Sequence, residues 1–66
     1  MTAREYRAAL AALGLTQVGA ARLLGVNDAT SRRWAKHGVT GTAAVLLKLM
    51  VRDPRLLKVI EECAAW

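Results

Sequence analysis

One stretch of the chain decides its fold, and it reads Gln17-Val-Gly-Ala-Ala-Arg-Leu-Leu-Gly-Val-Asn-Asp-Ala-Thr-Ser-Arg-Arg-Trp34. It predicts two short helices, Gln17 to Leu24 and about Asp28 to His37, because each follows a polar capping residue, Thr16 or Asn27, and stops before a glycine. Between them, Gly25 supplies the positive φ that a tight turn needs, and Ala21 is small enough for the helices to cross closely. The pattern predicts a helix-turn-helix, in which a short turn sets two helices at roughly 90–120°.

The residues on either side predict three more helices. Thr2-Ala-Arg-Glu5 is a capping box that starts a helix, and Gly14 stops it. An apolar run predicts a helix that starts near Thr40 to Thr42 and lies in the middle of the core or at an interface. Asp53 as a cap with Pro54 at the first position starts the last helix. Since no segment alternates as a strand does, we expect an all-α fold, a compact five-helix bundle containing the helix-turn-helix.

The length and net charge of the chain limit its possible functions. The 66 residues allow one domain, 1–66, with the motif at about 17–37. Ten Lys and Arg against five Asp and Glu give a net charge of +5. An excess of this size on so short a chain suggests a polyanionic partner, most often nucleic acid, although solubility alone is the alternative.

The composition also argues against several classes of protein. The single cysteine, Cys63, allows no disulfide within the chain and has no neighbouring ligand for a metal, which fits a reducing cytoplasm. No apolar run reaches the roughly 20 residues that span a membrane, and no signal peptide is recognisable. The one histidine, the one cysteine and the few acids form no catalytic set, so we expect neither enzyme activity nor a cofactor.

The motif resembles the helix-turn-helix domains of the lambda-repressor and Cro type, found in bacterial and phage transcriptional regulators. The matching residues are Leu15-Thr16-Gln17, Ala21, Leu24-Gly25-Val26 and Arg33-Trp34. With the flanking helices, the resemblance covers nearly the whole chain. It implies that a recognition helix at about 28–37 enters the major groove of double-stranded DNA. The apolar Val26 is expected to pin the turn to the core.

The candidate DNA-binding residues are Gln17, Arg22, Asn27, Asp28, Ala29, Arg32, Arg33 and Lys36. The resemblance implies base contacts from the start of the recognition helix and a phosphate contact from Gln17. Arg32 can bind guanine through two hydrogen bonds, and Ala29 can touch a thymine methyl. Asp28 can accept from cytosine, or it can simply favour the helix start. The other basic side chains would add salt-sensitive, sequence-independent affinity, or they are a solvated helix face.

Ser31 departs from the resembled family, which usually has Val or Ile on this buried side of the recognition helix. A buried hydroxyl without a partner costs roughly 1–3 kcal/mol. We expect Ser31 to bond back to the carbonyl of Asn27, four residues earlier. Trp34 is expected to pack in or beside the core, and His37 to end the helix.

The last helix carries more apolar residues than one side of a short terminal helix requires. We expect a homodimer through Leu56, Leu57, Ile60, Cys63 and Trp66. Cys63 on its own is expected to be a small buried apolar residue, and Trp66 either folds onto the core or joins the dimer contact.

The sequence therefore predicts a sequence-specific DNA-binding protein that regulates transcription in the cytoplasm of a bacterium or in a phage-infected cell. The alternative is a protein-interaction module that keeps the helix-turn-helix fold and binds a protein partner instead. The two are distinguished by whether Arg22, Arg32, Arg33 and Lys36 converge on one positive face or scatter.

Overall fold

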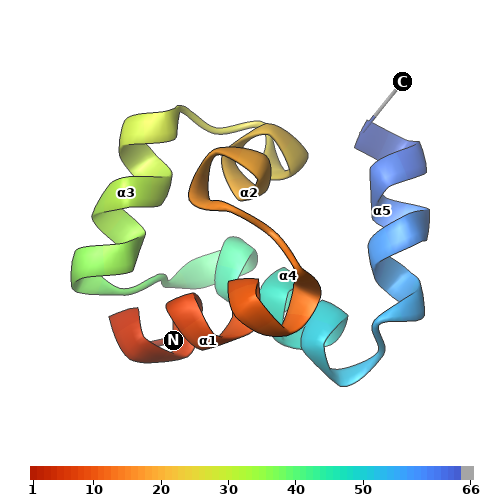
Figure 1. Cartoon of the computed structure of the whole chain (residues 1–66), viewed down its shortest axis with the longest axis horizontal. Helices are drawn as coiled ribbons and strands as arrows, with labels where there is room; N and C mark the ends of the chain where they lie inside the picture. The colour runs from red at the N-terminus through yellow and green to blue at the C-terminus, as the bar shows by residue number, and fades with distance from the viewer. Residues whose placement is uncertain (65–66) are drawn as a thin grey trace.

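A computed structural model of the chain describes residues 1–64, and within this range five helices and no strand are present (Figure 1). The helices are α1 (Ala3–Leu13), α2 (Gln17–Leu24), α3 (Asp28–His37), α4 (Gly41–Arg52) and α5 (Arg55–Ala64). The expectation of an all-α chain with five helices is confirmed. None of the described helices is long and apolar enough to cross a membrane.

The helices form a compact bundle in which α1 contacts α3 and α4, while α2 contacts α3 and α5. Figure 1 shows α3 and α5 at opposite ends of the molecule, with the other helices between them. The attachment of α5 is the lightest, because none of its residues is fully buried. Leu57 and Ile60 fasten it by packing against the core.

The start of α1 is closed by the predicted capping box. The Thr2 hydroxyl accepts from the Glu5 N–H at 3.1 Å, and the Glu5 carboxylate accepts from the Thr2 N–H at 2.9 Å. The hydrogen bond from the Thr2 backbone N–H favours the ionised carboxylate and lowers the pKa of Glu5. The first helix therefore begins where the sequence places it.

The start of α5 also uses the predicted cap. Asp53 accepts from the backbone N–H of Arg55 at 3.2 Å and forms an ion pair with its guanidinium at 2.9 Å. The Arg55 side chain, as hydrogen-bond donor, lowers the pKa of Asp53. Pro54 lies in the turn before the helix, so regular α5 begins at Arg55, one residue after the predicted position.

The core contains several alanines and one large aromatic side chain. Small residues let the helix axes approach, and larger side chains fill the remaining space. The buried cluster comprises Tyr6, Leu10, Ala20, Ala35, Val39, Ala44, Leu47 and Met50. Tyr6 is fully buried and is the largest of these side chains, so it is the main filler between α1 and its neighbours.

The buried hydroxyl of Ser31 is hydrogen-bonded to the hydroxyl of Tyr6. The two hydroxyl oxygens lie 2.6 Å apart, and both side chains are fully buried. The expectation that the Ser31 side chain bonds back to the Asn27 carbonyl is wrong. Its hydroxyl forms a hydrogen bond with the Tyr6 hydroxyl of α1 instead. Trp34 is half-buried, as expected, and meets the Tyr6 ring edge-on with centroids 5.8 Å apart. Tyr6 therefore fixes α3 through both a polar and an aromatic contact.

The N-terminal residue is bound to the loop between α3 and α4. The Met1 nitrogen donates to the Val39 carbonyl at 2.9 Å, and the Val39 N–H donates to the Met1 carbonyl at 2.8 Å. This pairing brings the chain close to Gly38, whose φ is +98°. A Cβ at Gly38 would lie 2.7 Å from the Met1 carbonyl oxygen, so both backbone conformation and space require glycine there.

We predict that Tyr6→Phe destabilises the protein by about 1–3 kcal/mol, since it leaves the Ser31 hydroxyl buried without a partner. Ser31→Ala should likewise orphan the Tyr6 hydroxyl. The double variant Tyr6→Phe/Ser31→Ala orphans neither group, and it should be at least as stable as Tyr6→Phe alone. Urea unfolding of the four proteins checks this. Strictly additive losses would contradict a direct Tyr6–Ser31 interaction.

We predict that Gly38→Ala costs about 3 kcal/mol or more, because backbone strain of about 1–3 kcal/mol adds to the clash with Met1. Gly25→Ala is the matched control, since Gly25 also has a positive φ but has open space around it. The control should cost only about 1–2 kcal/mol. Thermal and urea unfolding measure both, and equal losses would show that the close approach of Met1 contributes nothing.

Candidate nucleic-acid interface

The turn between α2 and α3 is built from local hydrogen bonds. Gly25 adopts φ +70°, and the Val26 N–H donates to the Ala21 carbonyl at 2.9 Å, which closes the end of α2. Asn27 then caps α3, with its Oδ1 accepting from the Ala29 N–H at 2.8 Å. Val26 itself is half-buried and lies outside the core cluster, so the expectation that it pins the turn to the core is wrong. Leu24, one residue before the glycine, packs there instead.

The exposed face of α3 collects three basic side chains. Ser31 and Ala35 are buried and define the inner side of the helix. Because each residue turns the helix by about 100°, Arg33 and Lys36 lie on the opposite side, and Arg32 flanks them. All three are exposed, and none forms an ion pair within residues 1–64. These side chains, together with the exposed Ala29, are called the α3 basic face below.

Arg22 does not join the α3 basic face. It lies in the last turn of α2 and lines a groove of about 360 Å³ between α2 and α5. Glu61 of α5 lines the same groove. Three of the four basic side chains named from the sequence therefore share one helix face, and the fourth is placed toward α5.

The other candidate DNA-binding residues, Gln17, Asn27 and Asp28, differ in whether their side chains are available to contact a ligand. Gln17 is exposed at the first position of α2, with its side chain at the positive end of that helix. Asn27 is exposed, but its carbonyl oxygen is occupied by the cap on Ala29. The two-bond contact between asparagine and adenine uses the same oxygen, which would have to accept a second hydrogen bond while the cap holds the side chain in place. Asp28 is half-buried in the first turn of α3, where a negative charge is favourable.

Arg7 is a residue that the motif did not reveal. It is exposed on α1, and its guanidinium donates to the Ala35 carbonyl in the last turn of α3. The contact adds a positive charge beside Lys36 at the negative end of that helix. No local pattern signals it, because the two partners are 28 residues apart in sequence.

Charge is unevenly distributed along the chain. Six of the ten Lys and Arg, but only two of the five acids, precede Gly38. The three helices that include the motif therefore carry most of the net positive charge. A polyanion would be attracted to this part of the molecule.

The predicted dimer residues of α5 fall into two groups. Leu57 and Ile60 pack against the chain's own core and are not free for a partner. Leu56 is half-buried outside that cluster, and Cys63 is exposed, which makes the expectation of a buried thiol wrong. Val59, one turn from each of them, is 52% exposed and was not anticipated. Trp66 lies outside the described residues.

No protein-family model matches the chain, and neither a curated protein nor a solved structure does. Across residues 1–64, the structure contains no group of three or more His, Cys, Asp or Glu side chains placed to hold a metal ion. The function must therefore be argued from the geometry of the α3 basic face.

Proposed function

We propose that this protein binds double-stranded DNA as a helix-turn-helix regulator of transcription in a bacterium or phage. The α3 basic face carries the proposal: Arg32, Arg33 and Lys36 project from one side of a helix whose other side is held by the core. A cationic face on a protruding helix is suited to the phosphate-lined major groove. Figure 1 places α3 at one end of the molecule, away from α5.

The proposed complex divides the contacts between specificity and affinity. The ten residues of α3 form a rod about 15 Å long, and the major groove, about 12 Å wide, admits such a helix. Arg32 would read guanine through its two parallel donors, and Ala29 would touch a thymine methyl. Arg33 and Lys36 would bind phosphates on the groove walls.

The start of α2 is suited to hold a backbone phosphate. Thr16 accepts from Gly19, and the Ala20 N–H bonds to the Thr16 carbonyl. Among the described residues, the N–H groups of Gln17 and Val18 have no acceptor. Free N–H groups at a helix start favour anions, and Gln17 adds a side-chain donor.

We predict that binding to a random pool of labelled duplex DNA weakens steeply with salt. Lys36→Ala should reduce the slope of log K against log salt by about 0.9, the value for one lost phosphate contact. Lys58→Ala, an equally exposed lysine on α5, is the control and should leave the slope unchanged. Fluorescence anisotropy across a salt series measures both variants.

Arg32→Ala separates specificity from affinity. After the preferred sequence has been selected from the pool, this variant should lose discrimination at one base pair by about 1–3 kcal/mol. An absence of duplex binding even at low salt would contradict the proposal. The protein-interaction module would then be the better interpretation of the same fold.

A homodimer completes the proposal, since two copies can place their α3 helices in successive major grooves. The free apolar residues of α5, Leu56, Val59 and Cys63, lie one turn apart and would form the contact. We predict that Val59→Asp converts a dimer into a monomer in sedimentation equilibrium, because it places a charge in that contact. Val18→Asp, an exposed valine on α2, is the control. A wild-type protein that stays monomeric at high concentration would rule out this dimer.

A further inference from the structure

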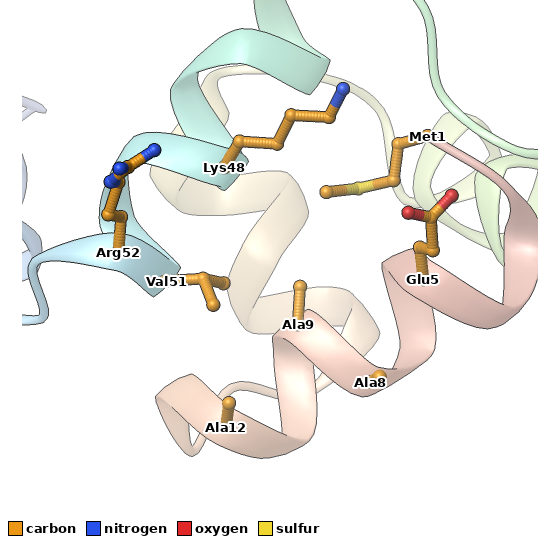
Figure 2. A pocket seen from close by; sticks show the side chains of 8 residues that line it. All are labelled: Met1, Glu5, Ala8, Ala9, Ala12, Lys48, Val51 and Arg52. Atoms are coloured by element: carbon orange, nitrogen blue, oxygen red, sulfur yellow. The ribbon is translucent and has the colours of Figure 1, made fainter.

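A second surface lies between α1 and α4, outside the α3 basic face. It is an open groove of about 640 Å³ lined by α1, α4 and Met1 (Figure 2). Figure 2 shows Ala8, Ala9 and Ala12 along the α1 side, with Val51 facing them from α4. Ala8 and Ala12 are exposed, and Val51 is 41% exposed. The floor of the groove is therefore apolar and formed mainly by small side chains, which would allow another helix to approach closely.

The α4 rim of this groove is positively charged. Lys48 and Arg52 are one turn apart and exposed, and neither forms an ion pair within residues 1–64. The only acid in the groove, Glu5, already accepts the Thr2 N–H in the capping box. Lys48 contributes only a minor part of the lowering of the Glu5 pKa. The groove thus combines an apolar floor with two cations that lack a close counterion.

The apolar surface continues past this rim. Val45 and Leu49 of α4 are 59% and 47% exposed, and they lie next to Lys48 and Arg52 on the helix surface. A protein of this size gains nothing in stability from exposing them. Cations set among exposed apolar side chains match a helix with an apolar stripe and acidic flanks.

We propose that this groove binds an acidic amphipathic helix of a partner protein. Charge complementarity favours such a partner over a second copy. Two copies of the groove facing each other would set the Lys48 and Arg52 of each copy against a single carboxylate, Glu5 of the other copy. No residue of α2 or α3 lines the groove, so the partner can be held while the α3 basic face is occupied.

The test selects binders from a displayed library of 18-residue helical peptides, with apolar residues fixed on one stripe and Glu, Lys, Gln or Ala allowed beside it. The full chain is the bait. Selected peptides should be enriched in Glu. Ala12→Arg should weaken their binding at least about tenfold, because it fills the groove and adds a charge to its floor. Ala11→Arg is the matched control, since Ala11 is an exposed alanine of α1 that does not line the groove.

A second pair of variants isolates the charge. Lys48→Glu should weaken the selected peptides about tenfold, whereas Lys58→Glu on α5 should not. The proposal is overturned if no peptide is enriched, if the enriched peptides lack an excess of Glu, or if Ala12→Arg binds them as the wild type does. Self-association that Ala12→Arg abolishes would assign the groove to a second copy and would overturn it too. Binding of the Ala12→Arg variant to duplex DNA, measured by anisotropy, should equal that of the wild type. The test of the groove is therefore independent of whether the DNA-binding proposal holds.

Discussion

The hydrogen bond between the Tyr6 and Ser31 hydroxyls fixes how α1 meets α3. The hydrophobic effect has no preferred direction, whereas a hydrogen bond between two buried hydroxyls 2.6 Å apart requires a particular distance and angle. The edge-on contact with Trp34 and the Arg7 bond to the Ala35 carbonyl act on the same helix. Together they set which side of α3 is turned to solvent, and hence where its basic residues point.

The small residues of the core make this arrangement possible. Ala20 and Ala21 of α2 and Ala35 of α3 are buried, and their small side chains let these helices pack closely in the core. A larger side chain at Ala35, one turn from Ser31 on the buried side of α3, would push α3 away from its neighbours and lengthen the Tyr6–Ser31 distance. The serine at position 31 is thus matched to the tyrosine at position 6, and the pair replaces the apolar contact that a branched aliphatic residue would make there.

The local features of the fold were predictable, while the long-range ones were not. Helix ends follow from caps such as Thr2, Thr16 and Asn27, because the donor and acceptor lie within three residues of each other. The partner of Ser31 lies 25 residues away, so the sequence suggested a wrong local bond. Arg32, Arg33 and Lys36 were named from the resemblance of the motif to a known family, and they lie on one exposed side of α3. Arg22 does not join them, because it lies on α2, and tertiary packing rather than a local pattern sets how α2 is oriented relative to α3.

The light attachment of α5 links stability to binding. A domain of this length buries only about 60% of the surface that its unfolded chain exposes, so its stability margin is small. A partner that binds only the folded state adds stability in proportion to RT ln(1 + [L]/Kd). The free apolar residues lie on α5, whereas the groove is lined by α1, α4 and Met1. Occupancy of either surface would therefore stabilise the folded bundle, and would lower the population of opened forms without touching the α3 basic face.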